Sequence, residues 1–198
     1  MLKFIFSTAQ KELGMKIKTY ASVLLILFTF KPIILLADEM IIGKESYENY
    51  HLVFEAAPKD KVFSDSTIIH LSESETDIHI EALITWRENI KIEGQIPNSH
   101  IPYLDVKAII VNEKTKESIN ISLVPHINLS DGFHYARNIK LPGLANEKYT
   151  VSFFIRPDDK LMTYHNDWKK KYGIPIINNI SHTYRNLDFY EMSKKLRR

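Results

Sequence analysis

The sequence has 198 residues, which is enough for one domain and a short processed segment, and it contains no cysteine. The absence of cysteine excludes disulfides, thiolate metal sites, cysteine nucleophiles and a lipid-bearing N-terminal cysteine. Five of the 26 basic residues but only one of the 24 acidic residues lie in the first 37 positions, so the remainder carries a net charge of −2. A footprint for nucleic acid is therefore excluded as well.

The first 37 residues have the organisation of a secretory signal peptide. Lys16 and Lys18 precede an apolar stretch that spans 20–30 and 33–36 and ends at Ala37. Met15 is an equally good translation start for this segment. We predict a signal at 1–37, a single domain at 38–198 and a periplasmic location. The alternative is that the segment stays attached as a membrane anchor.

Beyond the signal, short apolar runs alternate with polar turns, which predicts an all-β, antiparallel β-sandwich with short helices only. A basic run at 194–198 is expected to be a solvated end. The predicted strands are His51–Ala57, Thr76–Trp86, Tyr103–Asn112, Ser118–Pro125, Asn138–Leu141, Lys148–Ile155 and Leu187–Glu191.

His79 and Glu81 are two positions apart in a predicted strand. Side chains at this spacing point to the same face, so an imidazole and a carboxylate project together while Ile78 and Ile80 enter the core. This arrangement is half of a metal site. The alternative is the polar outer face of an ordinary strand.

Three more histidines lie in or beside predicted loops. His126 and His134 bracket the loop 127–133, and His165 lies in the polar segment between 155 and 174. Loops at one end of a sandwich can bring such residues together. Each signal is weak alone, and the prediction depends on their convergence in space. For the other histidines we expect surface or packing roles: His51, His70, His100 and His182.

The stretch 77–174 resembles the periplasmic iron-transport proteins, the membrane-antigen family of metal-binding proteins with an immunoglobulin-like fold. The family pattern contains Asp-x-His-x-Glu-Ala, Ile-Pro-Tyr-Leu, a Met-Pro-Met loop and Ser-Asp-Gly-Pro-His-Tyr, in that order. The matching segments here are 77–82, 101–104, 130–135, 138–140, 149–157 and 165–167. The resemblance implies an immunoglobulin-like antiparallel β-sandwich.

In that family a His, a Glu, a Met and two further His bind metal, which the resemblance carries over to His79, Glu81, His126, His134 and His165. The Met position falls on His126. This exchange removes the one soft ligand, disfavours Cu(I) and suits Cu(II), Zn(II) or Fe(II). We therefore expect copper or iron, with zinc as a third candidate.

The resemblance implies a homodimer with its sites near the dimer interface, working with a membrane iron permease. We predict an extracytoplasmic metal-binding protein that assists iron or copper uptake, and not an enzyme. A nucleophile elbow, a phosphate loop and a His-Glu-x-x-His motif are all missing from the sequence. The alternative function is an adhesion or assembly module that binds no metal.

Overall fold

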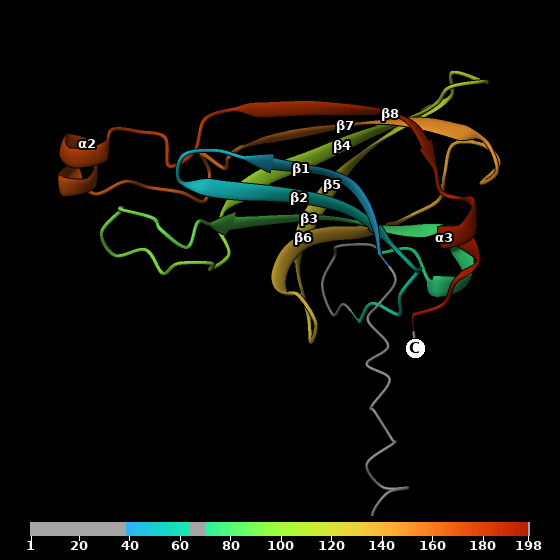
Figure 1. Ribbon diagram of the computed structural model, residues 1–198, viewed down its shortest axis with the longest axis horizontal. Helices are drawn as coiled ribbons and strands as arrows, with labels where there is room; N and C mark the ends of the chain where they lie inside the picture. The colour runs from blue at the N-terminus through green and yellow to red at the C-terminus, as the bar shows by residue number, and fades with distance from the viewer. Residues whose placement is uncertain (1–38, 64–69, 198) are drawn as a thin grey trace, which may run out of the picture. The chain divides into compact units, whose positions relative to one another are not determined.

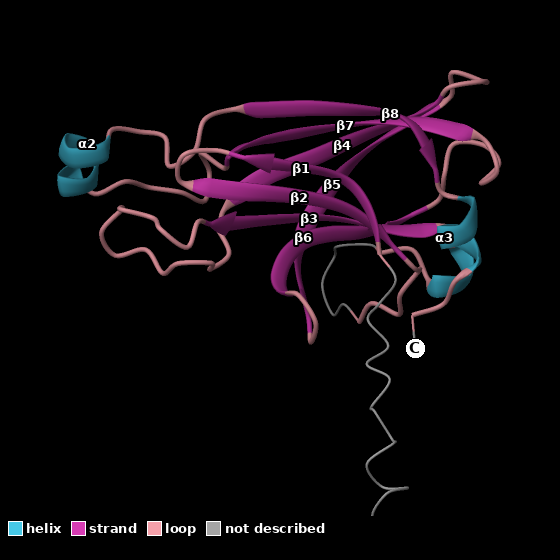
Figure 2. Ribbon diagram, viewed as in Figure 1, coloured by secondary structure: helices cyan, strands magenta, loops and turns pink. Residues whose placement is uncertain are grey.

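The computed structural model describes residues 39–63 and 70–197. The described residues belong to one compact unit, and the predicted signal at 1–37 lies outside them. The unit is built almost entirely of strands, with a few short helical segments at its periphery (Figure 2). Within the described ranges, no helix has the length and apolar character needed to cross a membrane.

The strands are β1 (Met40–Ser46), β2 (Tyr50–Ala57), β3 (Ile78–Trp86), β4 (Leu104–Asn112), β5 (Ser118–Asn128), β6 (Gly132–Ile139), β7 (Lys148–Pro157) and β8 (Ile180–Asp188). The helical segments are η1 (Glu73–Glu75), α2 (Asn166–Tyr172) and α3 (Tyr190–Lys194).

The eight strands pair antiparallel in the order β1-β2-β3-β6-β5-β4-β7-β8 (Figure 1). Strand β5 belongs to both halves of this order, because its first part pairs with β4 and its last part pairs with β6. The change of partner falls between Leu123 and Val124, immediately before Pro125. Proline has no N–H to donate to a ladder, so it is tolerated where strand pairing changes. After the switch β5 continues alongside β6, and this last part of β5 places His126 close to His79 on β3.

The edge strands β1 and β8 approach each other, and side chains join them. Tyr184 on β8 donates a hydrogen bond to Glu45 on β1, with 2.8 Å between Oη and Oε1. The Tyr184 ring packs directly over Gly43, where any Cβ atom would clash with it. A side chain at position 43, at the irregularity in β1 between Ile41 and Gly43, would therefore displace the Tyr184 ring.

The core lies between the two halves of the sheet. In β4 the alternation is regular: Leu104, Val106, Ala108 and Ile110 are buried. Phe54 of β2 and Phe153 of β7 stack between the layers with 4.1 Å between ring centroids. Burying each such aromatic side chain contributes about 1.5–3 kcal/mol.

The predicted all-β class and the antiparallel sandwich are confirmed. The immunoglobulin-like detail stays a prediction. Strand β1 was not predicted. The strand expected at 138–141 is only the end of β6, which begins at Gly132. The strand expected at 187–191 is largely wrong, because β8 ends at Asp188 and α3 begins at Tyr190.

Candidate metal centre

Strand β3 carries the first two candidate ligands. Ile78, Ile80 and Ala82 point into the core, so the alternate residues His79 and Glu81 point together to the other face of the strand. That face is covered as well, since both side chains are fully buried. A solvated polar face is therefore ruled out for this pair.

The hairpin of β5 and β6 carries two more candidate ligands. His126 and His134 are directly opposite each other in the ladder, rather than at the two ends of a loop as the sequence suggested. The real turn is shorter, at 128–132, because β5 continues past Pro125. Cross-strand partners lie about 4.5–5.5 Å apart at Cβ, so this pairing alone brings the two imidazoles together.

The three imidazoles converge in space. His79, His126 and His134 each present a ring nitrogen, and these atoms lie within 4.8 Å of one another. The ring centroid of His126 is 5.1 Å from that of His79 and 5.0 Å from that of His134. Glu81 adds a carboxylate, with Oε1 3.6 Å from His79 Nε2 and Oε2 3.9 Å from His134 Nε2.

Hydrogen bonds on the far side of two rings fix their tautomers. The amide nitrogen of Asn138 donates to the carbonyls of Asp60 and Leu71, so its oxygen accepts from His79 Nδ1 at 2.7 Å. Similarly, His134 Nδ1 donates to the Gly132 carbonyl at 3.0 Å. In both residues the lone pair is therefore on Nε2, which faces the other candidate ligands.

Three buried polar atoms at this point have no hydrogen-bond partner: Nε2 of His79, Nε2 of His134 and Oε2 of Glu81. An unsatisfied buried polar group costs about 1–3 kcal/mol, and three that face one another require an explanation. A metal ion would satisfy all three at once. The residues present therefore fit a cation.

Burial also sets the protonation states. Desolvation lowers the pKa of His79 to about 3 and that of His126 to about 4, and it lowers the pKa of His134. The imidazoles are neutral at pH 7, the form that binds metal. Desolvation raises the pKa of Glu81 to about 8, so a metal that binds this carboxyl displaces a proton.

The centre opens to solvent on the side of His126, which is only partly buried. This residue lines a cleft of about 440 Å³ together with His70, whose ring centroid is 6.1 Å from that of His126. Phe63 and Ile127 line this cleft and are exposed, and Leu129 and Phe133 are exposed in the same hairpin of β5 and β6.

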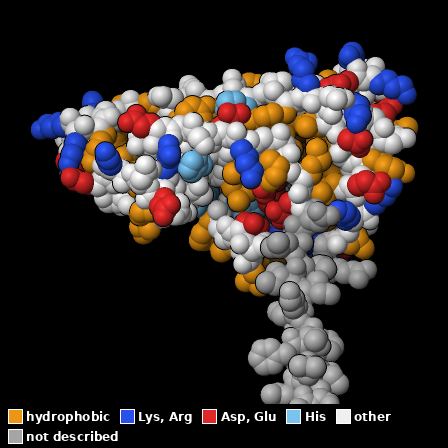
Figure 3. Space-filling model, viewed as in Figure 1, with side chains coloured by type: hydrophobic (Ala, Val, Ile, Leu, Met, Phe, Trp, Pro, Cys, Tyr) orange, Lys and Arg blue, Asp and Glu red, His pale blue; other side chains and the backbone are white. Residues whose placement is uncertain are grey.

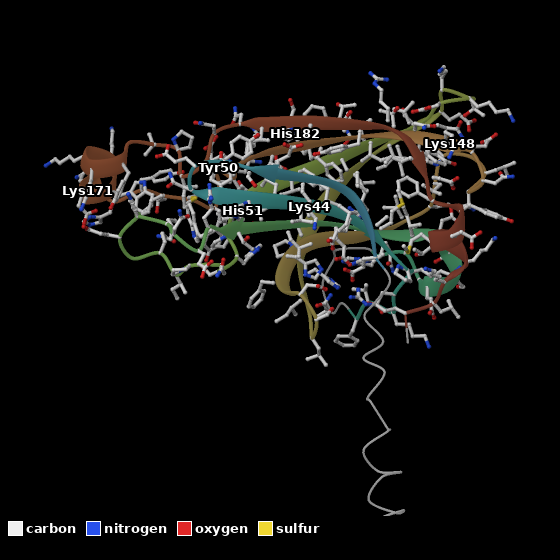
Figure 4. The ribbon with its side chains drawn as sticks, viewed as in Figure 1. Lys44, Tyr50, His51, Lys148, Lys171 and His182 are labelled. Atoms are coloured by element: carbon white, nitrogen blue, oxygen red, sulfur yellow. The ribbon has the colours of Figure 1, made fainter. Side chains whose placement is uncertain are left out.

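His165 does not join this group within one chain. It precedes α2, its side chain is 88% exposed, and its Nδ1 is 3.1 Å from Asp167 Oδ1. Figure 1 draws α2 at one end of the domain, away from β6. His51 and His182 lie elsewhere, hydrogen-bonded to Ser46 and Tyr47 respectively (Figure 4).

The four candidate ligands that meet are surrounded by residues whose role was not predicted from the sequence. Asn138 falls in a segment matched to the family pattern but carries no local signal of its role. Arg197 was expected to be part of a solvated end, and this was wrong: its side chain is only 13% exposed and lies 3.3 Å from Glu81 Oε1. Figure 3 shows acidic side chains grouped below the middle of the visible face.

Three imidazole nitrogens and one carboxylate oxygen form a set of borderline donors without sulfur. Such a set suits Cu(II), Zn(II) or Fe(II) in four- or five-coordination. The fold and the site together define a class: small antiparallel β-sandwich proteins with a buried histidine–carboxylate candidate metal centre.

The particular family follows from comparison with known proteins. The sequence model of the Fe2+ transport protein family matches residues 36–190, and the chain belongs to this family. No curated protein matches the sequence.

Solved structures of related proteins have the same fold. FetP of uropathogenic Escherichia coli strain F11, recombinantly expressed in the periplasm, is 25% identical, with a TM-score of 0.59 over 75% of this chain and 95% of that one. A copper-bound variant of the same FetP, with one glutamate replaced by glutamine, gives a TM-score of 0.60 over 75% of this chain and 90% of that one, at 25% identity. A copper-bound variant of Campylobacter jejuni P19, with one methionine replaced by isoleucine, gives 0.61 at 23% identity, over 75% and 96%.

Proposed function

We propose that this chain is an exported metal-binding protein of the iron-transport family and that His79, Glu81, His126 and His134 bind its metal cargo. The observation that carries the proposal is the convergence of three buried, unpartnered polar atoms on one point. Neutral imidazoles with fixed tautomers support it, because they can bind a cation without first losing a proton.

Iron and copper are the proposed cargo. The family is that of Fe2+ transport proteins, and related structures contain copper. The nitrogen and oxygen donors are compatible with either metal and with zinc. Because affinity rises towards copper along the first-row series, the metal that binds most tightly in solution is not by itself evidence of the physiological cargo.

A second copy of the chain is proposed to complete the centre through its own His165. Two features support a homodimer. His165 is 88% exposed and meets no other candidate ligand of its own chain. The hairpin of β5 and β6 carries exposed Leu129 and the exposed cross-strand partners Ile127 and Phe133, and exposed apolar side chains that lie together are typical of protein contacts.

We further propose that the protein works in the periplasm, after removal of residues 1–37, and passes its metal to a membrane permease. The family assignment and the FetP relative expressed in the periplasm support this location. The role is binding and transfer, without a chemical reaction on an organic substrate.

Native mass spectrometry of protein purified from the periplasm tests the proposal. With added Cu(II) or Zn(II), one ion per chain should bind, and a chelator should remove it. His134→Ala should abolish this binding, whereas the matched control His51→Ala, outside the centre, should leave it unchanged. An unmodified protein that binds none of Cu(II), Zn(II) or Fe(II), but captures a partner protein, would instead favour the adhesion or assembly function.

A further inference from the structure

A group of carboxylates lies directly beside the histidines. Oxygen atoms of Glu39, Glu81 and Asp131 lie within 4.8 Å of one another. They come from the residue before β1, from β3 and from the turn between β5 and β6. All three side chains are at most 15% exposed. Carboxylates held this close, out of water, repel one another when they are ionised, and a cation among them relieves that repulsion.

Arg197 supplies that cation. Its Nη1 lies 3.3 Å from Glu81 Oε1, and its Nη2 lies 3.2 Å from Glu39 Oε1 and 3.4 Å from Asp131 Oδ2. Nη2 also donates to Ser130 Oγ at 3.1 Å. One guanidinium thus offsets part of the negative charge of the acidic group and takes the position that a metal ion could take.

The last residues of the segment that carries Arg197 make a short backbone contact with another part of the chain. After α3 ends at Lys194, its backbone meets the loop that follows β2 through one bridge, between Leu196 and Lys59, and one 3.4 Å hydrogen bond from Arg197 N to the Lys59 carbonyl. Leu196 is 54% exposed. The family match ends at residue 190, so this segment lies outside the part that the family model covers.

Glu81 connects the two groups. Its Oε1 is near both Arg197 and His79, whereas its Oε2 is near His134 and unpartnered. A divalent ion held by the histidines and Glu81 would therefore sit beside a guanidinium that binds the same carboxylate. Two cations that contact the same carboxylate repel each other strongly, because the site is buried and water and salt screen their interaction only weakly.

We propose that Arg197 is an internal competitor of the metal: it occupies the acidic half of the centre in the metal-free protein, and metal binding displaces it together with the segment 195–197. This inference rests on the proposed function. By thermodynamic reciprocity, docking of Arg197 weakens metal binding by the same factor by which metal weakens docking. The segment thus favours release of the cargo, as delivery to another protein requires.

The test uses Arg197→Gln in the full chain, titrated with Zn(II) against a competing chelator. Arg197→Gln should bind Zn(II) at least about tenfold more tightly than the unmodified protein, within the usual range for coupled sites. Lys194→Gln is the matched control. It removes one positive charge from the same end of the chain, where the lysine pairs only with Glu191 and Tyr190 at the surface, and it should leave the affinity unchanged.

A second measurement separates competition from a general loss of positive charge. Hydrogen–deuterium exchange of the peptide spanning 189–197 should rise at least about fivefold when Zn(II) is added to the unmodified protein. Equal or weaker Zn(II) binding by Arg197→Gln, or exchange that Zn(II) does not raise, overturns the inference while leaving the metal centre intact. If neither protein binds Zn(II), the proposed function fails, and the inference fails with it.

Discussion

Replacing Asn138 by alanine should weaken metal binding although Asn138 is not itself a proposed ligand. Its side-chain oxygen accepts the Nδ1 hydrogen of His79 at 2.7 Å, and its amide nitrogen holds the carbonyls of Asp60 and Leu71. Without this partner the His79 ring is free to rotate and to change its tautomer. The lone pair on Nε2 then faces the centre for only part of the time.

The size of the effect follows from these contacts. Loss of a hydrogen-bond partner behind a metal-binding histidine costs about 10–100-fold in affinity. This corresponds to about 1.4–2.7 kcal/mol of binding free energy. The free energy of unfolding should also fall, by about 1–3 kcal/mol, because the buried His79 N–H is left unpaired.

The assay is a competition titration of Zn(II) against a chromophoric chelator, run well below the melting temperature so that both proteins are folded. Asn112→Ala is the control. Asn112 is as buried as Asn138 and is also hydrogen-bonded, but to Glu147 and to the turn that follows β4. The control should lose stability and keep its affinity. Equal Zn(II) binding by Asn138→Ala and the unmodified protein would refute the reasoning, as would an equal loss in the control.

Two further predictions concern the ligands. His126→Met should raise the affinity for Cu(I) and lower that for Zn(II), each by about tenfold or about 1.4 kcal/mol, because a thioether is the softer donor; competition with chelators specific for each ion measures both. Unchanged ratios would contradict the assignment of His126. The thermal stability of the metal-free protein should be highest near about pH 6.5. The folded-state pKa values of His79 (about 3) and His126 (about 4) lie below the unfolded value, so stability is lost as the pH falls below about 6.5. The folded-state pKa of Glu81 (about 8) lies above its unfolded value, so stability is lost as the pH rises towards 8. Melting temperatures that rise steadily from pH 5 to pH 8 would contradict this assignment of charges.

The parts of the fold that sequence reasoning predicted well are those with strict alternation. In β4 the buried positions recur every second residue, and in β3 the apolar residues Ile78, Ile80 and Ala82 alternate with His79 and Glu81. Both strands, and the facing of His79 with Glu81, therefore follow from local pattern. Strand β1 was not predicted because it is short, contains Gly43 and lies beside a segment interpreted as a signal peptide. Strand β8 was misplaced because it lies at the edge, where exposed polar residues such as Ser181 and Arg185 interrupt the apolar pattern.

The candidate site was predictable in part, for a different reason. Resemblance to a known family located the histidines and Glu81, but local pattern alone placed His126 and His134 at the two ends of a loop. Their direct pairing depends on β5 changing partner at Pro125, which is a property of the whole sheet.

Contacts between residues far apart in the chain could not be predicted from the sequence. Arg197 and Glu81 are 116 positions apart, and Asn138 and His79 are 59 apart. No local spacing links such pairs. A basic residue near an end is usually solvated, and only the packing of the segment after α3 against the start of β1 and the turn between β5 and β6 reveals that Arg197 is buried.

Crystals of the protein loaded with metal, measured for anomalous scattering at the Fe, Cu and Zn absorption edges, test the central claim most directly. The account predicts one strong peak about 2.0–2.2 Å from His79 Nε2, His134 Nε2 and a ring nitrogen of His126. A loaded crystal whose anomalous peak lies away from these three nitrogens, or that shows none, would contradict it.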